Sequence, residues 1–257
     1  MKLACEIPIN YIENCSQQTD FDFALAHLIL EDPEYASYYL KLKSTSTRKL
    51  ILDNGLFELG HALPSHKLFS AAELVQPDIL IAPDVLGDAF ETGQKFADFA
   101  TEYQARNYNL GVVIQGKTLT EAIGCYKHFS SLSNVDCICF PFGARYAEFA
   151  FLEKDAQCLC SRLALITQLT KQGLVNLNKW HHLLGAGLPY ELRLLSKFVW
   201  LNSVDTSIPF ISVMKSVPVL ESTEKLLRPG NYFTYPYDRD KVITFNDSIK
   251  YIKELVA

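Results

Sequence analysis

The sequence predicts an α/β fold with a parallel sheet, built either as a (β/α)₈ barrel or as a doubly wound sheet. Short, continuous apolar runs recur along the chain, and each is followed by a longer amphipathic stretch. The runs cover residues 2–8, 49–55, 78–84, 110–116, 136–143, 181–187 and 199–205. With 257 residues, the chain is long enough to bury a full core in one such domain.

The segments between the runs carry a helical pattern. Residues 88–106 and 118–131 are amphipathic, and Asp88 is placed to cap the first of these helices. Seven strands can be read from the pattern, and we expect the eighth near 208–213 or 231–235.

Composition is typical of a globular chain, with 49% hydrophobic and 21% charged residues. No apolar run approaches the roughly 20 residues that span a bilayer, and Glu6 comes too early for a signal peptide. We therefore expect a cytoplasmic protein without membrane contact. The loop-like segment 220–240 is too short to separate two domains, so we expect one domain over residues 1–257.

A net charge of −5 argues against tight, non-specific coating of DNA. A local basic patch stays open, although solvated helix faces are the favoured interpretation of the basic residues in the C-terminal third. These residues are Arg193, Lys197, Lys215, Lys225 and Arg228.

The seven cysteines are expected to be reduced thiols, because their number is odd and a secretion signal is missing. Cys137 and Cys139 alternate in an apolar run, as strand residues packed in a core do. Cys158 and Cys160 could form half of a zinc site, but no third cysteine or paired histidine follows at ligand spacing, which favours a structural role.

Polar residues and glycines stand at the C-terminal ends of the runs. In a barrel these ends form one face, where the connecting loops build the active site. Three carboxylates, a carboxamide and several glycines would then converge on one pocket. The residues at these ends are Asp53, Asp84, Gln115, Gly143, Gly185 and Asp205.

A single aspartate at a strand end is more often a turn residue or a helix cap. Six strand ends that all carry a polar residue or a glycine, in register, indicate a site. Two carboxylates on opposite sides of a sugar can exchange a glycosidic bond with retention, one as nucleophile and one handling protons. The glycine-rich loop with lysine that binds phosphate is missing. His181 and His182 are strand neighbours that point to opposite faces, so they cannot chelate one metal together.

Taken in order from about residue 49 to 210, the run ends resemble the guanine transglycosylase superfamily, the (β/α)₈ enzymes that exchange guanine for a 7-deazaguanine base. Residues 52–57, Leu-Asp-Asn-Gly-Leu-Phe, are similar to the family's Asp-Ser-Gly-Gly-aromatic segment. Residues 181–187, His-His-Leu-Leu-Gly-Ala-Gly, are similar to its His-Tyr-Leu-Met-Gly-Val-Gly. Residues 203–207 resemble the segment that carries the nucleophile, so the resemblance implies a single-domain (β/α)₈ barrel.

The resemblance also implies a role for each residue. Asp205 is the nucleophile, Asp53 is the general acid and base, and no metal or redox cofactor takes part. The implied base-binding residues are Phe57 and Leu184 on the two faces of the base, Asp84 and Gln115 at its polar edges, Gly143 through its N–H at the carbonyl oxygen, and Gly185.

Two departures bear on the substrate. No cysteine follows Cys160, so the zinc subdomain of the tRNA enzymes is missing, and residues 208–212 replace the segment that grips the anticodon loop. A compact chain without zinc resembles the branch from phages and bacteria that inserts 7-cyano-7-deazaguanine or a relative into DNA and so protects it from restriction. For a phage protein, the compartment would be the host cytoplasm.

Two other functions stay open. The same chemistry could act on tRNA, or the chain could be a non-catalytic paralogue that binds nucleic acid or a catalytic partner. The presence of both Asp53 and Asp205 argues against the paralogue, because a scaffold needs neither acid. A partner subunit or a homodimer could supply the nucleic-acid contacts that this acidic chain lacks.

Overall fold

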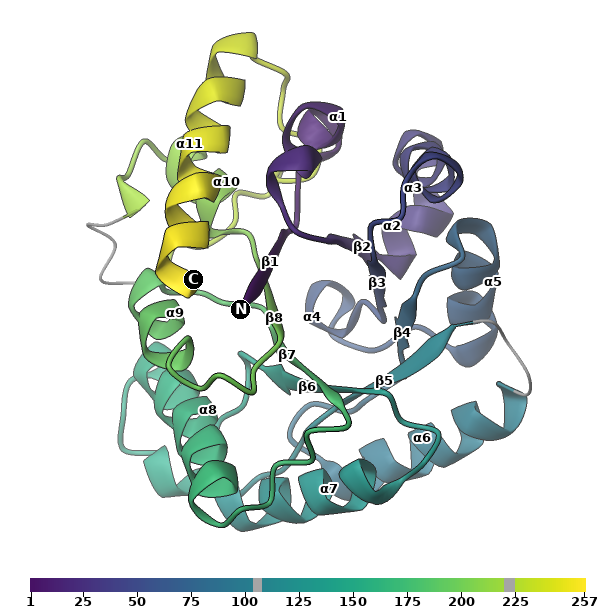
Figure 1. Ribbon diagram of the computed structural model, residues 1–257, viewed down its shortest axis with the longest axis vertical. Helices are drawn as coiled ribbons and strands as arrows, with labels where there is room; N and C mark the ends of the chain where they lie inside the picture. Colours follow the sequence, from purple (N-terminus) through teal and green to yellow (C-terminus); the bar gives the residue numbers. More distant parts are fainter. Residues whose placement is uncertain (104–107, 220–224) are drawn as a thin grey trace.

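Eight parallel strands curve into a nearly closed barrel, and helices surround it (Figure 1). The computed structural model describes residues 1–103, 108–219 and 225–257. The strands are β1 (Lys2–Cys5), β2 (Asp22–Leu25), β3 (Leu50–Asp53), β4 (Ile79–Ile81), β5 (Asn109–Val113), β6 (Cys137–Pro141), β7 (Trp180–Leu184) and β8 (Ser203–Thr206). They pair in the order β1-β8-β7-β6-β5-β4-β3-β2. Of the two predicted architectures, the barrel is confirmed.

The connections from one strand to the next are helical, as the alternating pattern predicts. The α-helices are α1 (Ile12–Cys15), α2 (Ala26–Glu31), α3 (Pro33–Thr45), α4 (Leu56–Leu59), α5 (Ser65–Val75), α6 (Ala89–Glu102), α7 (Leu119–Ser131), α8 (Lys154–Lys171), α9 (Pro189–Leu195), α10 (Ile208–Met214) and α11 (Arg239–Val256). Short 3₁₀ turns η1 (Ile9–Tyr11), η2 (Ser16–Gln18) and η3 (Ala147–Phe149) add to them.

The two predicted helices begin at their caps. The side chain of Asp88 accepts a hydrogen bond from the Glu91 N–H at 2.9 Å, and α6 starts at the next residue. Thr118 caps α7 in the same way. The predicted helix 88–106 reaches Glu102 in α6, and its residues 104–106 lie outside the described residues.

The eighth strand is β2, and both predicted positions for it were wrong. Residues 208–213 fall in helix α10, which begins directly after β8 with Pro209 in its first turn, and 231–235 form turns outside the sheet. The pattern missed β2 because the strand starts with the acidic Asp22 and follows irregular short helices. Asp22 can be buried there because Arg48 Nε donates to its carboxylate at 2.8 Å.

Side chains at the ends where the strands begin tie the strands together in pairs. An Asp or Asn stands just before each of β2, β4, β6 and β8. Its side chain accepts a hydrogen bond from a backbone N–H in the first half of the strand that precedes it in the chain. The four bonds run from the N–H groups of Leu3, Leu50, Leu110 and His181 to the side chains of Asp20, Asp78, Asp136 and Asn202. The first of them joins β1 to the segment before β2, where no ladder closes the barrel among the described residues. This end of the barrel is therefore built for stability.

Replacing Asp78 with alanine should lower the free energy of unfolding by about 1 kcal/mol, because the Leu50 N–H, 2.8 Å from Asp78 Oδ2, would lose its acceptor. Asp78→Asn is the matched control, since its amide oxygen can still accept this bond. Urea denaturation of the three proteins measures the difference. Equal losses in both variants would show that charge, including the Lys43 ion pair at 3.5 Å, is what stabilises this position.

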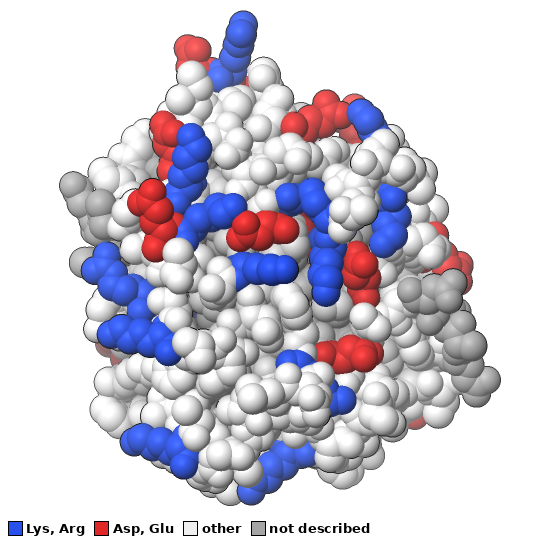
Figure 2. Space-filling view, in the orientation of Figure 1, with Lys and Arg blue, Asp and Glu red and all other residues white. Residues whose placement is uncertain are grey.

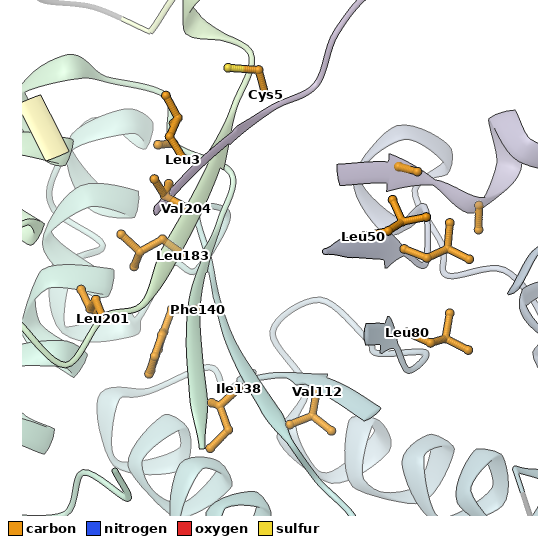
Figure 3. Packing of buried hydrophobic residues seen from close by; sticks show 14 of the residues in the cluster. Leu3, Cys5, Leu50, Leu80, Val112, Ile138, Phe140, Leu183, Leu201 and Val204 are labelled. Carbon is orange, nitrogen blue, oxygen red and sulfur yellow. The ribbon is translucent and has the colours of Figure 1, made fainter. Parts of the chain in front are cut away.

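The core has two layers. Alternate strand residues point outward and pack against the helices, and ten of the packed residues are labelled in Figure 3. The other strand residues fill the barrel with a separate cluster that includes Phe23, Ile51 and Ile81. Cys137 and Cys139 belong to that inner cluster, with their sulfurs 3.8 Å apart, so the prediction that they pack in a strand is confirmed. All seven cysteines are free thiols.

Figure 2 shows Lys and Arg side chains interspersed with Asp and Glu over the face seen in Figure 1. Arg193 is exposed on α9, and Lys197 and Lys215 are exposed just beyond the ends of α9 and α10. Lys225 and Arg228 do not lie on helices, so the interpretation as solvated helix faces was wrong for these two. Both are partly buried. Within the described ranges, no helix has the length and apolar character needed to cross a membrane.

Candidate active site

Three buried acids stand where β3, β4 and β8 end, at the mouth of the barrel. Asp53, Asp84 and Asp205 are 6%, 2% and 1% exposed. They are brought to one place because the C-terminal ends of parallel strands share one rim of a barrel. The helix α4, which follows β3, lies behind the ring of strands in Figure 1, so this mouth faces away from the viewer.

Asp53 is the last residue of β3, and its side chain continues the inward-facing row of Ile51. Its carboxylate accepts the Gly55 N–H at 2.9 Å. Burial nevertheless raises the pKa of Asp53 to about 7, and the nearby charges of Asp84 and Asp205 add to the rise. A carboxyl group with this pKa exchanges its proton near neutral pH, as a general acid and base must.

Asp84 is held by two side-chain amides. Asn54 Nδ2 and Gln115 Nε2 donate to its two carboxylate oxygens, each at 2.7 Å. Gln115 is oriented in turn by the Gly87 N–H, which donates to its Oε1 at 2.8 Å. Burial raises the pKa of Asp84 to about 6, against the lowering effect of the two amide donors. Asp84 and Gln115 thus form one fixed polar edge, with Asn54 as a member that the sequence analysis missed.

Asp205 lies on β8 opposite Ala4 of β1, and its two oxygens differ. Oδ1 accepts from His182 Nε2 at 3.0 Å and from the Gly185 N–H at 2.8 Å. Oδ2 is buried and has no hydrogen-bond partner among the described residues. His182 was missed as a partner of Asp205, because its alternation with His181 shows only that the two histidines face opposite ways and not which of them faces inward.

The remaining predicted residues lie on the rim. Phe57, on α4, is 68% exposed, and Leu184 ends β7 half-buried against the inner cluster. Gly143 follows β6, and a Cβ built on it would lie 3.6 Å from Leu86 Cδ1. Gly185 has a φ of +67°, which favours glycine, and directs its N–H at Asp205.

A cationic segment covers one side of this rim. Lys225 Nζ lies 4.2 Å from the ring centroid of Phe142 and 5.3 Å from that of Phe57. Arg228 forms ion pairs with Glu58 of α4, at 2.7 Å, and with Glu6, which follows β1. Helix α4 is four residues long with a left-handed glycine at each end, so these ion pairs hold the helix that carries Phe57.

A buried ion pair supports the β6 and β7 side of the mouth. Arg162 and Glu191 are 1% and 0% exposed and contact each other through the guanidinium and a carboxylate oxygen. Arg162 Nη1 also donates to the carbonyl of Gly185 at 2.6 Å. The backbone of Gly185 is therefore fixed on both sides, by Arg162 at its carbonyl and by Asp205 at its N–H.

Metal ligands do not gather in the described part of the chain, where no group of three or more His, Cys, Asp or Glu side chains could hold an ion. Cys158 and Cys160 both lie on helix α8, Cys158 buried and Cys160 partly exposed.

A surface hollow of about 660 Å³ lies between α1 and α3, and none of the three buried acids lines it. Its charged side chains, Glu13, Glu34 and Lys41, are exposed, as ordinary surface charges are. Buried acids with raised pKa values mark a functional site more strongly than the size of a hollow does, so we place the candidate site at the barrel mouth.

Comparisons with known proteins add no family assignment: no family model matches the chain, and a search of curated proteins finds no significant match.

Proposed function

We propose that the protein is a base-exchange glycosyltransferase that replaces guanine in DNA by a 7-deazaguanine through a covalent Asp205 intermediate. The observation that carries the proposal is the pair of buried acids in unlike environments at one barrel mouth. Asp53 has a pKa near 7 and is suited to proton transfer, whereas Asp205 has one oxygen anchored by two donors and one that no described residue contacts through a hydrogen bond. The resemblance to the guanine transglycosylase superfamily supplies the substrate.

The reaction would begin with the target deoxyguanosine flipped out of the base stack into the mouth. A lone pair of Asp205 forms a bond to the anomeric carbon, the glycosidic bond breaks, and its electron pair leaves with guanine. Asp53, in its protonated form, gives the departing base its proton. The products of this half-reaction are free guanine and a glycosyl ester on Asp205.

The second half-reaction reverses these steps with a new base. The incoming 7-deazaguanine gives its ring proton to the Asp53 carboxylate, and the ring nitrogen displaces Asp205 from the sugar. Two displacements at one carbon restore the original configuration. Asp53 thus serves as acid and then as base, which a pKa near neutrality allows in both directions.

The polar edge formed by Asp84 and Gln115 would recognise the base in both half-reactions. Gln115 Nε2 has a second N–H beyond the one it gives to Asp84, and the carboxylate oxygens of Asp84 have further lone pairs. Both side chains are held in fixed rotamers by their neighbours, which is what selective recognition of a flat base requires.

Exchange of labelled guanine tests the function. The purified protein should incorporate labelled guanine or 7-cyano-7-deazaguanine into duplex DNA, and denaturing electrophoresis should show a protein–DNA adduct. The second candidate function is base exchange in tRNA, which the same buried acids could catalyse. Parallel reactions with tRNA distinguish it from exchange in DNA. Absence of exchange into either nucleic acid would contradict the proposal and favour a non-catalytic role.

Phe57→Ala should weaken binding of the base, because an aromatic stack contributes about 1–3 kcal/mol per base. The expected result is a rise of about 10- to 100-fold in the KM for the base, with a smaller change in kcat. Phe57→Tyr keeps the ring and is the control. Phe57 is 68% exposed in the free protein, so the substitution should leave the unfolding midpoint nearly unchanged. An unaltered KM in the alanine variant would remove Phe57 from the binding site.

A further inference from the structure

A row of hydrogen bonds on the inner face of β7 and β8 leads to Asp205. Trp180 Nε1 lies 2.6 Å from Ser203 Oγ, and Ser203 Oγ lies 2.9 Å from His182 Nδ1. His182 Nε2 then lies 3.0 Å from Asp205 Oδ1. The sheet register sets this order, because His182 pairs with Ser203 and Asp205 follows two residues later on the same face.

The imidazole of His182 is fixed in this row. It is fully buried, and its ring stacks on Phe23 with centroids 5.8 Å apart and meets the edge of Phe21 at 6.0 Å. Both nitrogens are therefore held toward their partners by packing as well as by hydrogen bonds.

The donors and acceptors of the row determine where the protons lie. The indole N–H of Trp180 can only donate, so it uses a lone pair of Ser203 Oγ. The Ser203 hydroxyl hydrogen is then free to point at His182 Nδ1, and the proton of the neutral imidazole lies on Nε2. A histidine protonated on Nδ1 alone would set a bare nitrogen against a carboxylate oxygen, which repels it. The neutral ring therefore donates from Nε2 to Asp205.

The two oxygens of Asp205 are thereby made unequal. Oδ1 receives two hydrogen bonds, from His182 Nε2 and from the Gly185 N–H. Each donor draws electron density from this oxygen, whereas Oδ2 is buried and keeps its lone pairs unshared among the described residues.

We propose that Trp180, Ser203 and His182 form a positioning relay that anchors Asp205 Oδ1 and leaves Oδ2 as the atom that attacks the sugar. This inference rests on the proposed function, in which a lone pair of Asp205 forms the bond to the anomeric carbon and the base leaves with the electrons of the broken bond. His182 acts through Asp205 and does not touch the substrate.

The first test is the tautomer of His182, read by NMR on protein with ¹⁵N-labelled histidine and assigned by comparison with His182→Gln. The expected signature at neutral pH is protonated Nε2 and unprotonated Nδ1. A neutral ring with its proton on Nδ1 overturns the relay. This measurement needs no substrate, so it judges the relay even if the protein exchanges no base.

The second test is kinetic. His182→Leu should lower kcat for base exchange about 10- to 100-fold, because a hydrogen bond to a charged group is lost, and should leave the KM for the base unchanged. His182→Gln should recover most of that loss, since its amide N–H can reach Oδ1. His181→Leu removes a buried imidazole from the outer face of the same strand, so it should reduce stability without the kcat effect.

Each outcome decides the relay. A wild-type kcat in His182→Leu, or a glutamine variant as slow as the leucine variant, overturns it. If His182→Leu does not fold, the tautomer and the kcat of His182→Gln still decide the question. Absence of any adduct from the wild-type protein counts against the proposed function instead.

Discussion

Asp205→Asn should lose base exchange by a factor on the order of 10⁴ or more, because a neutral amide cannot replace a carboxylate as nucleophile. The fold should persist, since the asparagine side chain has nearly the same shape and its oxygen can still accept from His182 and Gly185. The measurements are labelled-base exchange and detection of the covalent adduct on a denaturing gel. Both signals should vanish together.

Asp84→Asn is the matched control for Asp205→Asn. It also removes a buried carboxylate from the mouth, but Asp84 is held at the polar edge by Asn54 and Gln115. This variant should therefore still form the adduct and should change base affinity or selectivity. An Asp205→Asn protein that forms the adduct at the wild-type rate would show that another residue is the nucleophile.

The barrel and its three acids could be predicted because both depend on local pattern. A buried parallel strand requires a continuous apolar run, and an acid at the end of such a run is costly unless it is used or paired. Asp53, Asp84 and Asp205 all stand at these ends. Since parallel strands share one rim, the order of the runs was enough to place the three acids together.

The parts that could not be predicted depend on partners distant in sequence. Strand β2 is acceptable in the core only because Arg48 neutralises Asp22. Arg228 reads as a surface charge until Glu6 and Glu58 are seen beside it. His182 needs the register between β7 and β8 before its hydrogen bond to Asp205 can be recognised.

The sequence pattern also could not predict the pKa values of the acids at the strand ends. Asp53 and Asp84 are both buried acids at strand ends, yet the pKa of Asp84, at about 6, is held lower by two amide donors. Asp53 accepts a backbone N–H, and its pKa rises to about 7. Asn54 and Gln115 lower the pKa of Asp84, whereas the charges of Asp84 and Asp205 add to the rise at Asp53, and the sequence shows neither set of contacts.

Asp53→Asn should lower base exchange by about 10²- to 10⁴-fold, the usual contribution of a general acid or base. In the wild-type protein, the rate of adduct formation should fall as pH rises through about 7, because the departing guanine needs the protonated form of Asp53. The Asp53→Asn variant should form the adduct slowly, and its rate should not show this fall near pH 7. A rapid-quench pH profile of adduct formation compares the two proteins. A fall near pH 7 that persists in the variant would assign the titration to another group.

The same substitution should stabilise the protein in a pH-dependent way. The pKa of Asp53 lies near 7 in the folded protein and near 3.8 when unfolded, so the folded state binds the extra proton between these values. Stability therefore decreases as pH rises from about 4 to 7, and the loss is complete above 7. Asparagine carries no charge, so Asp53→Asn should unfold like the wild type at pH 4 and resist urea better at pH 8, by on the order of a few kcal/mol. Equal stabilities at pH 8 would mean that the charged Asp53 is well solvated in the mouth, and its role as an acid near neutral pH would lose its physical basis.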